Sequence, residues 1–474
     1  MPLILGTNSI KDTGYDVANS CMFNDGDSAY MHKTFASGGT ETAWTISMWV
    51  KRGALGSDQR VFSCDDSSDG DPDNYWRFKS DDTLQVNIYN GSTIGNLVTN
   101  RKFRDCSSWY HICVIWKSGD STSTDRLQLW VNGTRETSFS ATTFPSEDAA
   151  TVTSSQVVAI GRRNYGPQQY FDGYLAEVVF LDGVTASPVG TLGEFDEDSP
   201  TIFKAKDPSG LSFGTNGFYL DFEDSSNLGN DANGGTDFTE VNLAATDQCS
   251  DSPTNNFATL NPLCKGSYTT LSNGNLTTVG NTSSDNGTAV STIPLAFSGK
   301  YYWEVKLTQY ASGYPVIGLF LDWESVSQGD MNGGGSHFVG SDDVYVKGNS
   351  DTTIYSADGD ITSQTGYADG DIIMFAGDMD NGALYIGRNG TWQNSGDPES
   401  GASETGKIVN LDTTKQHMMT VHDYNGSDTD WNFGNPSFSI SSGNADGNGY
   451  GNFEYAPPSG YLALCTKNLG SDGG

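Results

Sequence analysis

The sequence contains few basic residues. Lys and Arg number 25 against 59 Asp and Glu in 474 residues, so the formal net charge is −34 at pH 7. A field of this sign repels phosphate groups, which argues against nucleic acid or an anionic membrane as a partner. Histidine is also scarce, with five residues, and the seven cysteines include no CxxC pair. The usual spacing of a zinc site is therefore absent.

Long apolar runs are absent too. The longest have the length of a strand, whereas a membrane-spanning helix needs about 20 residues. The Pro2–Leu5 segment is too short for the apolar core of a signal peptide and follows no basic residue. We therefore expect no membrane insertion and no signal peptide. Most cysteines are expected to be buried thiols, although Cys249 and Cys264 flank one loop-like segment and could form a bridge.

Aromatic residues and glycine are abundant, and apolar and polar residues alternate along much of the chain. This composition is typical of a folded, turn-rich protein, and a period of two predicts strands. The stretch 45–50 alternates, 109–116 is apolar throughout, and Leu127–Val131 precedes an Asn132-Gly133 turn, after which 135–139 is expected to return as the partner strand. One helix is predicted from Ser187-Pro188 to about Phe195.

The second half repeats the strand pattern. Alternation over 301–307 and a hairpin turning at Asp380-Asn381-Gly382 are the strongest signals. Between the halves, the stretch 221–262 is rich in Asn, Asp and Gly and has few apolar residues. The sequence thus predicts an all-β protein: two antiparallel β-sandwich (jelly-roll) domains, 1–205 and 265–474, joined by an extended linker or arm over 206–264.

Several segments of the first half resemble the laminin-G-like and pentraxin-like jelly rolls of the concanavalin A-like superfamily. In order from about Cys21 to Pro188 they are Phe23–Tyr30, Thr45–Arg52, Trp109–His111, Leu127–Gly133, Ala159–Gly161 and Phe171–Val178. This resemblance implies a domain that binds ligands or protein partners, often with calcium on a rim loop.

The second half resembles the SPRY domain from about Thr269 to Leu469. The matching segments are Gly299–Val305, Gly370–Ile373, Asp378–Gly382, Asn389–Trp392, Asn432–Gly434 and Pro457–Leu469. SPRY domains bind protein partners, and neither resemblance by itself implies catalysis.

The whole arrangement, including Thr246–Pro262, looks like large structural proteins of marine bacteriophages. That resemblance implies a virion protein that assembles in the host cytoplasm, contacts other virion proteins and forms a homo-oligomer. It would lie in a fibre, another appendage or a capsid decoration, and would attach to host glycans or envelope proteins. A purely architectural subunit, whose arm binds its neighbours, is the alternative.

A calcium loop is a candidate metal site. Asp65, Ser67, Asp69 and Gly70 have the spacing of alternating oxygen ligands, and Asp71 and Asp73 follow. The carboxylate expected at the twelfth position is replaced by Trp76, and the flanks look like strands, so this is not an EF-hand. A solvated acidic loop is the alternative. At Asp378-x-Asp380-Asn381-Gly382, turn chemistry explains the residues better than a metal does.

A sugar site needs flat apolar rings beside fixed polar groups. Tyr75, Trp76, Tyr165 and Tyr170 fall in predicted loops of the first domain, although most aromatics of a β-sandwich belong to its core. Catalysis has less support. Glu194–Ser199 lacks the last carboxylate of a glycosidase E-x-D-x-x-E strand, and His111 lies in a predicted buried strand. We therefore expect a binding protein and no enzyme, with a polysaccharide depolymerase as the weakest alternative.

Overall fold

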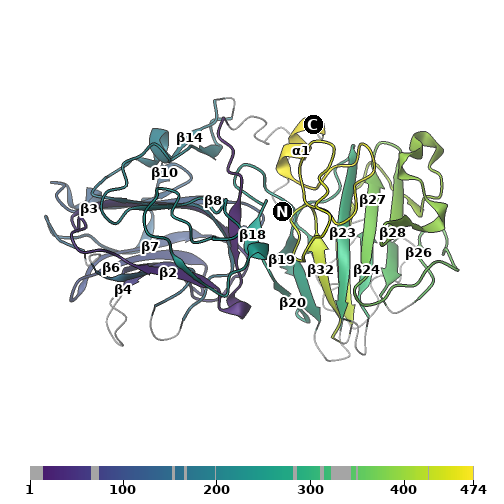
Figure 1. The fold of residues 1–474 in the computed structure, drawn as a ribbon, viewed down its shortest axis with the longest axis horizontal. Coiled ribbons are helices and arrows are strands. Elements are labelled where there is room, and N and C mark those ends of the chain that lie inside the picture. Colours follow the sequence, from purple (N-terminus) through teal and green to yellow (C-terminus); the bar gives the residue numbers. More distant parts are fainter. Residues whose placement is uncertain are drawn as a thin grey trace. The chain divides into compact units, whose positions relative to one another are not determined.

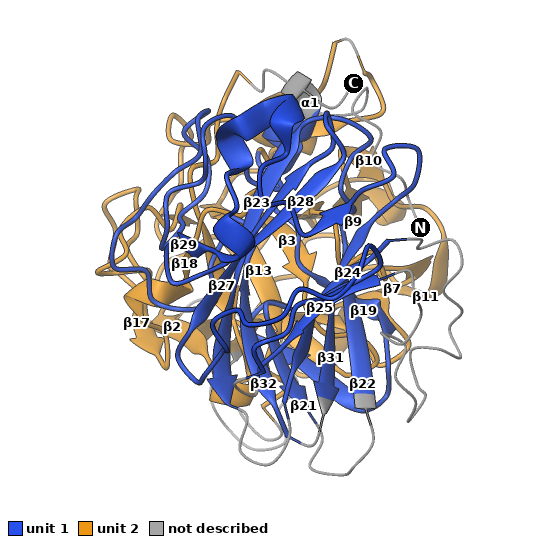
Figure 2. Cartoon of the chain, turned by 90° about the vertical axis from the view of Figure 1, so that its right-hand side faces the viewer, with its two compact units in different colours: residues 1–11, 255–474 blue, residues 12–254 orange. Residues whose placement is uncertain are grey.

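The computed structural model describes residues 14–65, 74–151, 155–164, 168–197, 199–280, 286–309, 314–321, 343–348, 351–424 and 426–472. The protein is all-β, and α1 (Thr466–Asp472) is the one α-helix of these residues. No helix in this part of the chain is long and apolar enough to span a membrane. The chain forms two compact units, an N-terminal unit of residues 12–254 and a C-terminal unit that begins at Asn255 (Figures 1 and 2).

Two eight-stranded antiparallel sheets form the N-terminal unit. In spatial order, sheet A contains β10 (Thr134–Arg135), β9 (Leu127–Val131), β8 (Tyr110–Lys117), β3 (Ala43–Arg52), β13 (Gly173–Asp182), β1 (Ser20–Phe23) and β18 (Gln248–Cys249), and β16 (Phe218–Leu220) also pairs with β13. Sheet B contains β11 (Phe139–Thr143), β7 (Thr93–Lys102), β6 (Thr83–Tyr89), β5 (Asn74–Phe78), β4 (Gln59–Asp65), β12 (Val157–Ile160), β2 (Tyr30–Thr34) and β17 (Thr239–Val241). Both sheets contribute to one buried core.

The C-terminal unit is a second pair of antiparallel sheets. Sheet C contains β19 (Leu260–Lys265), β22 (Asn286–Ser291), β31 (Met418–Tyr424), β24 (Val316–Phe320), β25 (Asp343–Lys347) and β26 (Tyr355–Ser356). Sheet D contains β20 (Thr269–Ser272), β21 (Thr277–Gly280), β32 (Asp428–Asn432), β23 (Lys300–Gln309), β27 (Ile372–Asp378), β28 (Ala383–Arg388) and β29 (Thr391–Trp392), with β30 (Val409–Asn410) on β28. In the core of the C-terminal unit the rings of Trp303 and Phe375 stack, with their centres 5.1 Å apart.

The hairpin predicted at Asp380-Asn381-Gly382 is confirmed, since it joins β27 to β28. The Asp378 carboxylate accepts hydrogen bonds from the backbone N–H groups of Asp380 and Asn381, both at 3.0 Å. Lys300 Nζ lies 2.9 Å from the same carboxylate. These carboxylate oxygens therefore hold the turn together, which supports turn chemistry over a metal site.

The helix predicted from Ser187 to Phe195 is wrong. One irregular turn covers Pro188–Leu192, and Gly190 inside it has a φ of +88°, which a right-handed helix does not allow. The chain then becomes extended as β14 (Gly193–Phe195), which pairs with β15 (Phe203–Ala205). Gly193 lies so close to Phe203 that a Cβ atom there would be 2.4 Å from the ring. The close packing of Phe203 against Gly193 thus favours an extended strand here, although the sequence carries the signal of a helix start.

The stretch expected to form an extended arm folds onto the N-terminal unit instead. Its few apolar and alternating segments become strands: β16 pairs with β13, β17 with β2, and β18 with β1. Cys249 lies in β18 of this unit and Cys264 in β19 of the other, and both are thiols. The polar composition of the stretch suggested that it could not fold by itself. Its few apolar residues are enough for it to form strands because the two sheets of the unit offer free edges for pairing.

Two consecutive basic residues at the end of β3 are buried on opposite faces of sheet A. Lys51 Nζ lies 2.6 Å from Asp251, and both side chains are at most 1% exposed. Asp251 also accepts from Trp109 Nε1 at 2.9 Å. Arg52 points into the sandwich, over the ring of Phe78, and pairs with Asp82 at 3.2 Å.

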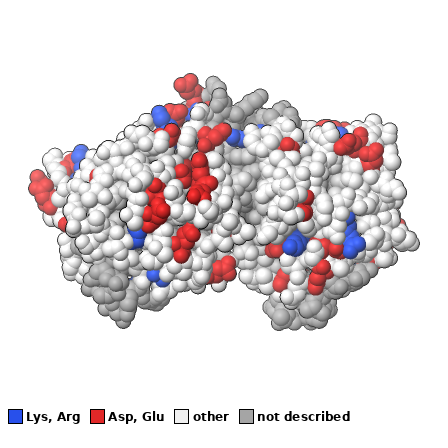
Figure 3. Space-filling view, viewed as in Figure 1, with Lys and Arg blue, Asp and Glu red and all other residues white. Residues whose placement is uncertain are grey.

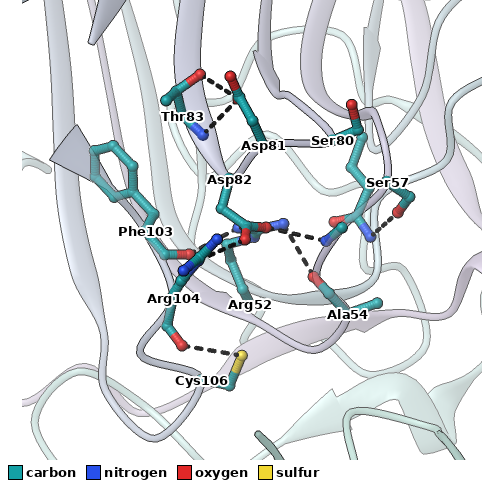
Figure 4. A network of polar contacts seen from close by, with 12 residues as sticks. Arg52, Ala54, Ser57, Ser80, Asp81, Asp82, Thr83, Phe103, Arg104 and Cys106 are labelled. Carbon is teal, nitrogen blue, oxygen red and sulfur yellow. Dashed lines mark hydrogen bonds and ion pairs between the residues drawn. The ribbon is translucent and has the colours of Figure 1, made fainter. Parts of the chain in front are cut away.

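The Arg52–Asp82 pair joins three loops (Figure 4). Arg52 donates to the carbonyl oxygens of Phe103 and Ala54, at 2.7 and 3.1 Å. Asp82 in turn accepts from Arg104 Nε at 2.8 Å. The connections after β3, β5 and β7 are thereby fixed to one another at the same end of the sandwich.

We predict that Asp251→Ala destabilises the N-terminal unit by about 3–5 kcal/mol, because it leaves the Lys51 ammonium buried without its counter-charge. The measurement is denaturant unfolding followed by tryptophan fluorescence. Glu194→Ala is the control, since its ion pair with Lys206 is half-exposed and should contribute no more than about 1 kcal/mol. Equal effects of the two substitutions would contradict the prediction.

Two carboxyl groups are buried among hydroxyl groups. Asp423 of β31 accepts from Thr269 and Thr278, at 3.2 and 3.1 Å, and burial raises its pKa to about 8. Glu177 of β13 accepts from Tyr219 at 2.9 Å and from Tyr15 at 3.1 Å, and burial again raises its pKa to about 8. Both groups are therefore mostly protonated in the folded protein at neutral pH.

We predict that Asp423 makes the C-terminal unit less stable as the pH rises from about 4 to about 8. In this range the folded state holds a proton that the unfolded chain has released, so the free energy of unfolding falls with pH and levels off above the folded pKa. Asp423→Asn mimics the protonated group and should flatten the pH profile of the melting temperature over this range. An unchanged profile in the variant would contradict the assignment.

Candidate functional site

The outer face of sheet B carries a row of polar and aromatic side chains. Successive cross-strand neighbours from β2 to β7 are His32, Ala159, Ser63, Tyr75, Asn87 and Asn96. The alternate neighbours in the same strands, Met31, Ile160, Phe62, Trp76, Val86 and Leu97, all lie in the core. Because side chains alternate along a strand, the first row must face away from the core.

Arginine and tyrosine side chains pack together on this face. We call Tyr30, Arg60, Tyr75, Arg77, Arg162 and Tyr170 the arginine–tyrosine face. The Arg60 and Arg77 guanidinium groups lie 4.0 and 5.3 Å from the centre of the Tyr75 ring. Arg162 stacks on Tyr30 at 3.5 Å, and the rings of Tyr30 and Tyr170 are 6.4 Å apart. Stacked guanidinium and phenol groups of this kind form flat, amphipathic surfaces.

Hydrogen bonds hold these side chains in place. Arg77 donates to Asp58 at 2.8 Å and to Gln85 at 2.9 Å, and Gln85 donates to Asn96 at 2.8 Å. Arg60 Nε donates to the Gln169 side chain at 2.8 Å, which ties the segment before Tyr170 to β4. The face is therefore preorganised by strands and by a polar network across them, as a binding surface requires.

The electrostatics of the face differ from those of the chain as a whole. On the surface shown in Figure 3, acidic side chains are more common than basic ones. Arg162, in contrast, forms no ion pair with any described residue, and its Nε is buried without a hydrogen-bond partner among them. Burial and the nearby Arg162 charge lower the pKa of His32. Arg162 donates one hydrogen bond, from Nη1 to the Gln168 side chain at 3.4 Å, and its positive charge is not neutralised by a described carboxylate.

Comparison with known proteins agrees with the sandwich architecture. Residues 24–187 match the concanavalin A-like lectin/glucanases superfamily. The matched residues lie within the N-terminal unit. No curated protein matches the chain. The resemblance of this half to that superfamily is confirmed, and the arginine–tyrosine face lies within the matched residues.

Solved structures with similar folds include three from different organisms. The SPRY domain of human HERC1 is 16% identical, covers 36% of this chain and 96% of its own, and has a TM-score of 0.28. A heptameric SAP-like pentraxin from Limulus polyphemus is 18% identical, with coverage of 41% and 94% and a TM-score of 0.30. A putative carbohydrate binding protein from Bacteroides ovatus is 16% identical, with coverage of 48% and 58% and a TM-score of 0.34. At these scores the likenesses do not bear on function.

The structure separates the four predicted ligand-binding aromatics. Tyr75 and Tyr170 both belong to the arginine–tyrosine face: Arg60 lies over the Tyr75 ring and donates to Gln169, the residue before Tyr170. Trp76 does not: it is 1% exposed, packs on Phe62 and belongs to the core, because β5 turns successive side chains to opposite faces. Tyr165 lies outside the described residues. The alternation of Tyr75 and Arg77 with Trp76 and Phe78 in the sequence could have shown this.

The predicted calcium loop connects β4 to β5. Asp69, Asp71 and Asp73 lie outside the described residues, and only the backbone of Asp65 is described. No cluster of three or more His, Cys, Asp or Glu side chains suited to a metal occurs in the described part of the chain. The calcium site stays a prediction.

The residues considered for catalysis have other partners. Glu194 and Asp196 form ion pairs with Lys206 and Lys204, at 3.2 and 3.3 Å. His111 is fully buried in β8 and contacts Ser47 at 2.7 Å, and burial lowers its pKa to about 3. The two carboxylates are thus neutralised by lysines, and His111 is enclosed in the interior of the unit.

Adjacent aromatic residues of β5 should respond differently to truncation. We predict that Trp76→Ala lowers the free energy of unfolding by about 3–5 kcal/mol, the usual cost of removing a large core side chain. Tyr75→Ala should cost less than Trp76→Ala, because the Tyr75 ring packs on the outer face, against Arg60 and Arg77. Denaturant unfolding of both variants checks this, and a reversed order would show that the faces of β5 are assigned wrongly.

Proposed function

We propose that the protein is a non-catalytic binding protein whose arginine–tyrosine face binds an acidic glycan. The observation that carries the proposal is the Arg162 guanidinium, stacked on Tyr30 and without an ion-pair partner among the described residues. A carboxylate or sulfate of a sugar would supply the missing partner, because guanidinium groups form paired hydrogen bonds with such oxyanions. The tyrosine rings would pack on the apolar faces of the sugar rings.

The concanavalin A-like fold supports this binding role. We place the function on the surface of a bacteriophage virion, as an adhesion, fibre or appendage component that binds host glycans or envelope proteins. The support for this location is the sequence resemblance to marine bacteriophage structural proteins. The architectural alternative has less support than the sequence suggested, since the segment expected to be a free arm pairs with β1, β2 and β13.

A glycan array on the full-length protein tests the proposal, with uronate-containing or sulfated glycans beside neutral ones of matched size. We predict preferential binding to the acidic glycans and a loss of at least about tenfold in Arg162→Ala, since a hydrogen bond to a charged group is typically worth about 1.5–3 kcal/mol. Binding should weaken as the salt concentration rises. A parallel series with calcium and with EDTA tests the predicted calcium loop.

Lys117→Ala is the matched control, because it removes one exposed positive charge from sheet A of the same unit. Its binding should equal that of the wild type. Equal losses in both variants would mean that net charge governs binding, and the arginine–tyrosine face would then not be the site. Absence of acidic-glycan binding by a correctly folded protein would favour the architectural role.

A further inference from the structure

A cleft opens between the edges of the two sheets of the N-terminal unit. Its volume is about 440 Å³, which falls within the range of about 300–1,000 Å³ typical of small-molecule sites. The cleft lies between β9 and β10, at the edge of sheet A, and β11, at the edge of sheet B. Its lining includes Leu127, Leu129, Arg135, Glu136, Phe139 and Thr142.

The cleft exists because the chain leaves sheet A early. The sequence predicts a return strand over 135–139, but β10 contains only Thr134 and Arg135, and the Glu136 N–H makes one more bond to β9, to the Leu129 carbonyl oxygen at 2.8 Å. The next residue, Glu136, accepts from the N–H groups of Thr137 and Ser138, at 3.1 and 3.0 Å, and pairs with Arg101 of β7 at 2.9 Å. These contacts draw the chain across to sheet B, where β11 begins.

Apolar and polar groups are segregated in this cleft. Leu127 and Leu129 are fully buried members of the core, and Phe139 and Phe144 pack against it while remaining partly exposed. The exposed Thr142 lines the cleft from β11. The lining thus combines an apolar floor with hydroxyl, amide and guanidinium groups, which matches a ring that has one apolar face and hydroxyls at its edge.

The charged groups of the cleft are neutralised within the protein. Arg135 pairs with Asp125 at 2.6 Å and donates to the Thr124 carbonyl oxygen at 2.6 Å. Burial acts to raise the pKa of Glu136, but the Ser138 N–H and Arg101 more than offset it, so the pKa is lowered and the group stays ionised beside Arg101. An ionic ligand would have to compete with these partners. The cleft therefore suits an uncharged ligand, unlike the arginine–tyrosine face.

We infer that this cleft is a second binding site, for a neutral hydroxylated ring such as an uncharged sugar residue. It is separate from the arginine–tyrosine face, because that face lies on the outside of sheet B whereas the cleft opens between the sheets. Neither site requires the other, so the inference stands or fails independently of the proposed function.

Saturation-transfer NMR on the full-length protein tests the inference. The probes are the methyl glycosides of glucose, galactose and N-acetylglucosamine, with galacturonate as the charged probe and indole as the apolar one. Thr142→Tyr should fill the cleft and weaken the neutral-glycoside signals at least tenfold. Thr143→Tyr is the matched control, because Thr143 is the next residue of β11, is equally exposed, and does not line the cleft. Tyrosine suits a strand, so both variants should fold, which their unfolding transitions will check.

Neutral-glycoside signals that persist in Thr143→Tyr and fall in Thr142→Tyr would support the inference. Signals that are equal in the two variants would overturn it. No neutral-glycoside signal in the wild type at millimolar concentration would also overturn it, as would binding of indole alone. Arg162→Ala separates the two sites: it should leave the neutral-glycoside signals unchanged, and their loss in that variant would contradict a separate cleft.

Discussion

The stability of the N-terminal unit depends on two consecutive basic residues that are both buried at the end of β3. Lys51 and Arg52 point to opposite faces of sheet A, and each meets an aspartate from a distant part of the chain. Buried ions are costly unless they are paired, so each carboxylate must be in place for the fold to close. Asp251 thereby attaches the end of the Asn/Asp/Gly-rich segment, and Asp82 joins three loops at one end of the sandwich (Figure 4).

This arrangement determines which surfaces can carry function. Loops at the Arg52 end are held by carbonyl and carboxylate contacts and have little freedom to adapt to a ligand. The outer face of sheet B and the gap between the sheet edges are formed by strands instead. Side chains there are fixed by cross-strand neighbours, which is the condition for a preorganised site. Arg77, Gln85 and Asn96 form such a network across three strands.

The net charge of the chain does not show how charged side chains are distributed over its surface. A value of −34 argues against nucleic acid as a partner, yet it says nothing about where the 25 basic residues lie. Several of them gather on one sheet face, where tyrosine rings stack on the guanidinium groups. Elsewhere carboxylates serve as structural acceptors: Asp378 holds a turn, and Asp423 and Glu177 are buried among hydroxyl groups. An acidic composition therefore need not mean an acidic binding surface.

The sequence by itself determined the class of the fold and most of its strands. Alternation at 45–50 and 127–131 and the turn chemistry of Asn132-Gly133 and Asp380-Asn381-Gly382 are local properties, and local sterics decide them. Tyr75 and Tyr170 were expected in loops, but Tyr75 lies in β5, and their role in ligand binding stays a prediction. Tertiary structure decided the rest, because it depends on contacts between residues far apart in the chain. The segment expected to be an arm forms β16, β17 and β18, because it pairs with strands of the two sheets. The segment expected to end a helix forms β14, because it pairs with β15, which contains Phe203. The buried pairing of Phe62 with Trp76 placed that tryptophan in the core, and the return strand of the β9–β10 hairpin is shorter than expected because the chain crosses to sheet B, where Glu136 pairs with Arg101.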